Sequence, residues 1–202
     1  MKKLPDVLTE KEIAALLKQP NKRAPTGLRN FCIMRIMLDA GLRASEVINL
    51  NVNDIDWESG WLKVRQGKGK KDRILWLNED ALGLLKGWRN QRLVIRDEGS
   101  EGNKGDKCNS DRLFVTLDGK TLSDRYLRAM VKRYASKAEI SKNVHPHTLR
   151  HTFGTDLYKS TRNIRLVQKA LGHADLSTTM IYTHIMDEEL EDAMKSFRTR
   201  AN

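Results

Sequence analysis

The sequence has few cysteines, no long hydrophobic run and no internal repeat. Its two cysteines are Cys32, in an apolar stretch, and Cys108, in a polar one, so no disulfide framework is expected. No stretch approaches the roughly 20 apolar residues that a membrane-spanning helix needs. The first residues, MKKLPDVLTEKEIAALL, do not resemble a signal peptide, because acidic and polar residues follow the two lysines at once. These absences favour a globular, cytoplasmic protein without a membrane partner.

Basic residues, by contrast, are in large excess. Lysine and arginine number 37 against 26 acidic residues, which gives a net charge of +11. The excess is spread along the chain: residues 1–101 carry 19 basic and 14 acidic residues, and residues 102–202 carry 18 and 12. A folded basic chain most often binds a polyanion, with DNA or RNA first, although a solvated basic surface without a specific partner has the same composition.

Hydrophobic spacing predicts a mainly α-helical fold. Thr9 and Glu12 form a capping box that opens a helix through about Lys18, and a second helical pattern ends at Gly41. A short helix follows from Ser45. Later helices are expected at about 79–92 after an Asn78 cap, 123–137, 148–158, 162–171 with Gly172 as C-cap, 177–183 and 187–198.

One region predicts β-structure instead. Residues 61–66 and 73–77 are rich in β-formers and flank a Gly-Lys-Gly turn, as in an antiparallel hairpin. Residues 54–58 are expected to add a third strand to this small sheet. The polar, glycine-bearing residues 97–111 predict a mobile surface loop. We expect residues 1–202 to form a single domain.

The stretch HPHTLRH, residues 145–151, places His147, Arg150 and His151 on neighbouring positions of a helix. A zinc site is one interpretation, but a metalloprotease needs a glutamate where Thr148 stands, and Arg150 would repel the metal. Buried or capping histidines are a second interpretation. The third is an anion site, in which Arg150 supplies a two-pronged guanidinium and His147 a further donor.

Other segments carry residues suited to anion binding. Arg43 lies in the turn GLRASEV, with Glu46 three residues later, a spacing that orients a guanidinium but also occurs in surface salt bridges. Lys68 lies between two glycines in GKGKKDR, where the backbone can approach a phosphate, or where a basic turn is simply solvated. Tyr182 follows His173 by nine residues in LGHADLSTTMIYTH, and could equally belong to the core.

Together these motifs resemble the catalytic domain of the tyrosine recombinase (phage integrase) family, with the Xer recombinases as the nearest group. The family pattern is an arginine in a GLR.SE turn, a lysine in a GKG..R hairpin, an H..R pair, an LGH and a tyrosine nine residues further on. The matching residues here are Arg43, Lys68, His147, Arg150, His173 and Tyr182. The resemblance runs from about Leu4 to the C-terminal helix.

The resemblance implies a site-specific recombinase that cleaves DNA through a 3′-phosphotyrosyl link. Tyr182 would be the nucleophile and Lys68 the proton donor to the leaving 5′-oxygen. The arginines and histidines would bind the non-bridging oxygens, with Glu46 and His151 in support. No metal and no cofactor are expected, because the arginines supply the positive charge.

The resemblance also bears on partners and domains. Most family members carry an N-terminal DNA-binding domain, which we expect to be absent here, and we therefore expect weak, salt-dependent binding to double-stranded DNA. The family assembles as a tetramer on two duplexes, and we expect a monomer in the absence of DNA. Residues 187–198 form an amphipathic pattern that packs either on the chain's own core or on a neighbouring protomer.

Two other functions fit the same residues. A type IB topoisomerase shares the strand-cleavage chemistry but relaxes supercoils by itself. A DNA-binding module that is inactive without its missing domain is the alternative from outside the enzymes.

Overall fold

The computed structural model of the chain describes residues 6–65, 72–98, 111–173 and Thr179. Its elements in chain order are α1 (Glu10–Lys18), α2 (Pro25–Ala40), α3 (Ala44–Asn49), the 3-10 helix η1 (Val52–Asp54), β1 (Trp61–Val64), β2 (Arg73–Trp76), α4 (Glu79–Glu98), α5 (Asp124–Lys137), α6 (Pro146–Thr161) and α7 (Ile164–Leu171). The prediction of a mainly helical fold with a small antiparallel sheet is confirmed. No helix of these described ranges is long and apolar enough to cross a membrane.

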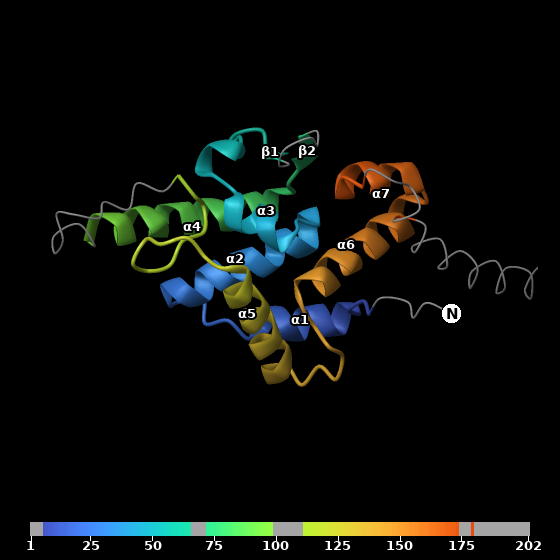
Figure 1. Cartoon of the computed structure of the whole chain (residues 1–202), viewed down its shortest axis with the longest axis horizontal. Helices are drawn as coiled ribbons and strands as arrows, with labels where there is room; N and C mark the ends of the chain where they lie inside the picture. Colours follow the sequence, from blue (N-terminus) through green and yellow to red (C-terminus); the bar gives the residue numbers. More distant parts are fainter. Residues whose placement is uncertain (1–5, 66–71, 99–110, 174–178, 180–202) are drawn as a thin grey trace, which may run out of the picture.

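Helix α2 is the centre of the core. It packs against both α4 and α6, and Figure 1 shows it between these two helices. Most of its apolar side chains are buried, and those of Ile33, Met34 and Met37 are fully buried. Burial of one such side chain stabilises the fold by about 1.5–3 kcal/mol, so α2 makes a large contribution to the core.

Local sequence signals determine where several helices begin and end. Thr9 and Glu12 form the predicted capping box at the start of α1. Gly41 and Gly172 end α2 and α7 in the left-handed conformation, as a C-cap glycine does. The Asn78 side chain accepts the backbone N–H of Ala81 at the start of α4. These four predictions are confirmed.

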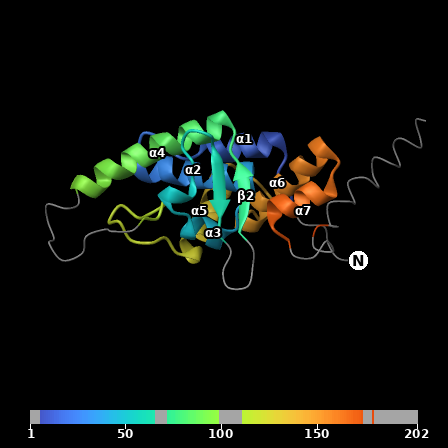
Figure 2. The same cartoon turned by 90° about the horizontal axis from the view of Figure 1, so that it is seen from above.

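The hairpin lies beyond α3, on the side away from α1 and α5 (Figure 1). Strands β1 and β2 pair antiparallel, with Trp61 opposite Trp76 and Val64 opposite Arg73. Figure 2 shows β2 beside α7, in agreement with the contacts between these elements. The predicted hairpin is therefore confirmed for its paired strands, while its turn, residues 66–71, lies outside the described residues.

The prediction of a third strand at residues 54–58 is wrong: the sheet has two strands in the described part of the chain. Ile55 forms an isolated bridge to Leu62, and the Asp56 N–H donates to the Trp61 carbonyl at 2.9 Å, but the pairing does not extend into a strand. The short acidic side chains on either side bond the local backbone instead. Asp54 accepts the N–H of Asn51, and Asp56 accepts the N–H groups of residues 58 and 59.

Two helices are longer than predicted. Helix α4 continues to Glu98, so the first two residues of the expected loop 97–111 are helical. Helix α6 begins at Pro146, because proline fits the first helical turn, and it ends at Thr161. Residues 99–110, and the predicted helices at 177–183 and 187–198 apart from Thr179, lie outside the described residues.

Candidate active site

The turn between α2 and α3 presents Arg43 next to its acidic partner. The Glu46 carboxylate accepts the backbone N–H of Arg43 at 2.8 Å and an N–H of its guanidinium, also at 2.8 Å. The Arg43 side chain is 30% exposed, whereas that of Glu46 is 7% exposed. The acid is thus buried beneath an arginine that reaches the surface.

Glu46 binds a second guanidinium from the hairpin. Arg73 donates to both carboxylate oxygens of Glu46, at 2.8 and 2.9 Å, and its side chain is 7% exposed. Burial alone would raise the pKa of Glu46. The hydrogen bonds and charge of Arg73, the Arg43 backbone N–H and the charge of Arg150 outweigh burial and lower that pKa to about 2. Glu46 is therefore an anion at every physiological pH.

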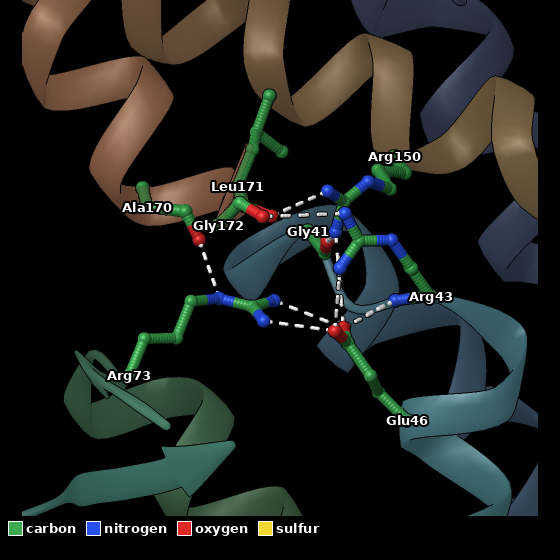
Figure 3. A network of polar contacts seen from close by, with 8 residues as sticks. All are labelled: Gly41, Arg43, Glu46, Arg73, Arg150, Ala170, Leu171 and Gly172. Atoms are coloured by element: carbon green, nitrogen blue, oxygen red, sulfur yellow. Dashed lines mark hydrogen bonds and ion pairs between the residues drawn. The ribbon is translucent and has the colours of Figure 1, made fainter. Parts of the chain in front are cut away.

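Arg150 projects from α6 toward the same carboxylate. Its guanidinium donates to the carbonyl oxygens of Gly41 and Leu171, both at 2.5 Å, and lies 3.8 Å from a Glu46 oxygen. Figure 3 shows the Arg43, Arg73 and Arg150 guanidiniums converging on Glu46. Three positive groups therefore surround one negative group, and the cluster has an excess of positive charge.

The end of α7 closes the other side of this cluster. Three consecutive carbonyls, those of Ala170, Leu171 and Gly172, accept hydrogen bonds from Arg73, Arg150 and Arg43 respectively. The last carbonyls of a helix have no partner within it and carry its negative dipole end, so guanidiniums are favourable there. The arginines thus join the Glu46 carboxylate to the C-terminus of α7.

The backbone conformation of Gly41, whose carbonyl accepts from Arg150, can be tested by mutation. It adopts φ +60°, and a Cβ at this position would overlap the ring of Phe153. Gly41→Ala should lower the free energy of unfolding by about 1–3 kcal/mol, from backbone strain and crowding. Urea denaturation measures this loss. Gly83→Ala in α4 is the control, because a Cβ at Gly83 would meet nothing within 4 Å, and it should be neutral or stabilising.

Two partly buried histidines lie within the electrostatic field of the arginines. Burial, followed by the charges of Arg150 and Arg43, lowers the pKa of His173 to about 4. Burial, followed by the charges of His147 and Arg150, lowers the pKa of His151 to about 4. Both imidazoles are neutral at pH 7.

His173 and His147 differ in position and exposure: His173 is partly buried after α7, and His147 is exposed on α6. His173 follows the α7 cap, and its Nδ1 lies 3.0 Å from the Thr179 hydroxyl. Where that hydroxyl donates to Nδ1, the ring N–H is on Nε2 and can donate to an anion. His147 is exposed in the first turn of α6, and burial and neighbouring positive charge lower its pKa as well.

These pKa shifts predict a pH dependence of stability. The ordinary histidine pKa is about 6.5, so the unfolded chain binds protons between pH 6.5 and 4 that folded His151 and His173 do not. The melting temperature should therefore fall as the pH decreases through this window. Thermal unfolding at a series of pH values measures the trend. The double variant His151→Gln, His173→Gln should show a flatter profile, and an unchanged slope would contradict the assignment.

The structure brings together Arg43, Glu46, Arg150, His151 and His173 from the set proposed on sequence, with His147 at the edge. Lys68 and Tyr182 lie outside the described residues. Arg73, the last residue of GKGKKDR, received no role from the sequence, although the family's hairpin pattern contains an arginine. Its signal was the alternation in β2, where Arg73 shares the buried side of the strand with Leu75. A charged side chain is rarely buried unless it is paired, so an arginine at a buried strand position predicts an acidic or carbonyl partner.

The arrangement can bind an oxyanion and stabilise negative charge that develops on it. Guanidiniums held by buried partners lose little freedom when they bind, and their effect is larger where water is scarce. Among the described residues, no group of three or more histidine, cysteine or acidic side chains could hold a metal ion.

Comparisons with known proteins give a consistent result. The family model described as "Phage integrase family" matches residues 6–189. Tyrosine recombinase XerD of Staphylococcus saprophyticus is 36% identical over 200 residues, which cover 99% of this chain and 65% of that protein. The chain therefore spans less than two thirds of the length of this relative.

Solved structures show the same similarity. The crystal structure of XerA recombinase superposes with a TM-score of 0.79 at 32% identity, over 99% of this chain and 68% of the other. The XerH site-specific recombinase, bound to a palindromic difH substrate in a post-cleavage complex, superposes with a TM-score of 0.77 at 33% identity, over 95% and 53%.

Proposed function

Because the chain belongs to the phage integrase family, we propose that it is a site-specific DNA recombinase that cleaves and rejoins strands through a 3′-phosphotyrosyl intermediate. The observation that carries this proposal is the cluster of three guanidiniums around Glu46, with Arg43 reaching the surface. A phosphodiester is a monoanion that gains charge in its transition state, and such a cluster stabilises that charge.

The reaction exchanges one ester bond for another. The Tyr182 phenol oxygen attacks phosphorus, the bond between phosphorus and the 5′-oxygen breaks, and the 5′-oxygen takes up a proton and leaves as a hydroxyl. A phenol has a reference pKa of about 10, so Tyr182 must lose its proton during the attack. Attack by the 5′-hydroxyl of another strand reverses the step. No nucleotide cofactor is required, because the phosphotyrosyl bond conserves the energy of the broken ester. No metal is required, because the arginines supply the positive charge.

The remaining residues receive roles in the same proposal. Arg43 and Arg150 bind the non-bridging oxygens, and His173 adds a hydrogen bond. His147 assists removal of the phenol proton, and Lys68 supplies the proton to the leaving group. His151 and Glu46 support the arginines.

The environment of the other tyrosines supports Tyr182 as the nucleophile. The Tyr126 hydroxyl donates to Asn30, and the Tyr134 hydroxyl accepts from the same amide side chain. Tyr158 is 2% exposed, in a small core with α7. Three of the four tyrosines thus serve the core of the described structure and are poorly placed to attack DNA.

Double-stranded DNA is the proposed partner, and the structure of the similar XerH site-specific recombinase bound to a palindromic difH substrate supports this proposal. We further propose a tetramer on two duplexes, with residues 187–198 packing on a neighbouring protomer. Deletion of residues 187–202 should then abolish assembly on DNA, as measured by light scattering, while the α1–α7 fold persists in circular dichroism. A deleted chain that still assembles would contradict this arrangement.

Covalent trapping tests the proposed function. The protein is incubated with partly degenerate duplexes that carry nicks, so that the cleaved 5′-hydroxyl fragment diffuses away and religation fails. A protein–DNA adduct that survives denaturing electrophoresis is expected, and mass spectrometry should find the nucleotide on Tyr182. The absence of an adduct with every duplex, or an adduct on another residue, would refute the proposal.

A further inference from the structure

We propose that Arg73 is a positioning residue for strand cleavage, which fixes Glu46 and through it the guanidinium of Arg43. The proposal rests on the recombinase function above. Arg73 has no role in that proposed function. It lies below the surface of the site and would act through its neighbours.

The contact between Arg73 and Glu46 leaves the carboxylate no freedom to rotate. Both terminal nitrogens of Arg73 bind it, one to each oxygen, at 2.8 and 2.9 Å. Each carboxylate oxygen also accepts a second hydrogen bond: one from the Arg43 guanidinium and the other from the Arg43 backbone N–H. A carboxylate offers about four lone-pair sites, so these four donors saturate it.

The third nitrogen of Arg73 fixes the other side of the site. Its Nε–H donates to the Ala170 carbonyl at 2.8 Å, one residue before the Leu171 carbonyl that binds Arg150. Arg73 therefore spans the distance between α3 and the end of α7, as Figure 3 shows. His173 follows this helix end directly.

Loss of Arg73 should release the carboxylate toward Arg150. Glu46 already lies 3.8 Å from the Arg150 guanidinium, and the charge of that group attracts it. A carboxylate that turns this way withdraws its support from Arg43, the arginine that reaches the surface. Lysine cannot replace Arg73, because a single ammonium does not reproduce a planar fork that binds two oxygens and a carbonyl.

The first experiment compares two substrates in single-turnover cleavage at saturating DNA. Arg73→Lys and Arg73→Met should both cleave a normal phosphodiester about 10²-fold more slowly than wild type, as expected for misplaced groups. With a methylphosphonate at the scissile position, which is neutral and has less need of an arginine clamp, the loss should be much smaller. A purely structural role predicts the same loss on both substrates.

The control variant is Lys63→Met on the same hairpin. It removes one positive charge from an exposed pair with Asp72, away from Glu46, and should cleave both substrates at wild-type rates. An equal loss on the two substrates for the Arg73 variants, or full recovery of the rate in Arg73→Lys, would overturn the proposal.

A second experiment needs no DNA and so separates this proposal from the proposed function. Millimolar sulfate should raise the melting temperature of wild type and of Lys63→Met, because an anion that binds the folded state stabilises it. The rise should be much smaller for Arg73→Lys and Arg73→Met. Equal rises in all four proteins, or none in wild type, would overturn the role of Arg73. If the sulfate responses are as expected but no covalent adduct forms, the proposed strand cleavage would be refuted while the positioning role of Arg73 would stand.

Discussion

Arg150→Lys is expected to slow strand cleavage by about 10²–10³-fold, the loss typical of removing one preorganised donor from an oxyanion site. The positive charge remains in this variant, so the loss would come from geometry. The Arg150 guanidinium binds the Gly41 and Leu171 carbonyls, which belong to residues far apart in sequence, while it lies beside Glu46. One ammonium cannot hold both carbonyls and still bind two phosphate oxygens.

Single-turnover formation of the covalent adduct at saturating DNA measures this effect without a contribution from binding. Arg165→Lys in α7 is the matched control, because Arg165 is exposed and its guanidinium contacts only the Gln168 side chain, at 3.4 Å, among the described residues. It should cleave at the wild-type rate. A near-normal rate in Arg150→Lys would show that charge alone suffices and that the two carbonyl bonds do not matter.

Much of the fold follows from signals that are local in the sequence. The α1 capping box and the glycines at 41 and 172 are read from a few adjacent residues, and the helix ends follow from them. The reason why the prediction of a third strand at residues 54–58 is wrong is local as well. Asp54 and Asp56 have β-rich neighbours, but their short side chains accept nearby N–H groups and favour turns, so pairing with the hairpin does not extend beyond the Ile55–Leu62 bridge.

The candidate site was only partly predictable, because its framework joins residues that are distant in the chain. The motifs identify Arg43 and Arg150, but no spacing places the Gly41 carbonyl on Arg150, 109 residues away. Likewise Arg73 bonds Ala170 across 97 residues, so its role depends on the packing of β2 against α7. The roles of Lys68 and Tyr182 stay predictions, since the structure does not describe them.

Glu46→Gln should lower the free energy of unfolding by about 3–5 kcal/mol, the range for removing one partner of a buried ion pair. The amide keeps the shape of the side chain but leaves Arg73 and Arg150, 7% and 6% exposed, without their counter-charge. Urea denaturation should show a lower midpoint with an unchanged slope. Glu12→Gln is the matched control, because Glu12 is the third residue of α1 as Glu46 is of α3, and each carboxylate accepts the backbone N–H of the residue that caps its helix.

The control separates helix capping from charge burial. Glu12 pairs with Lys142, and these side chains, at 22% and 32%, are more exposed than Glu46, Arg73 and Arg150, so loss of the pair should cost at most about 1 kcal/mol. The pH dependence gives a second test. Arginine contacts lower the pKa of Glu46 from 4.5 to about 2, so its stabilisation is complete above pH 4.5 and is lost as the pH falls toward 2. The difference between wild type and Glu46→Gln should shrink over that window. A difference that stays constant would mean that the ionised carboxylate is not what stabilises the three arginines.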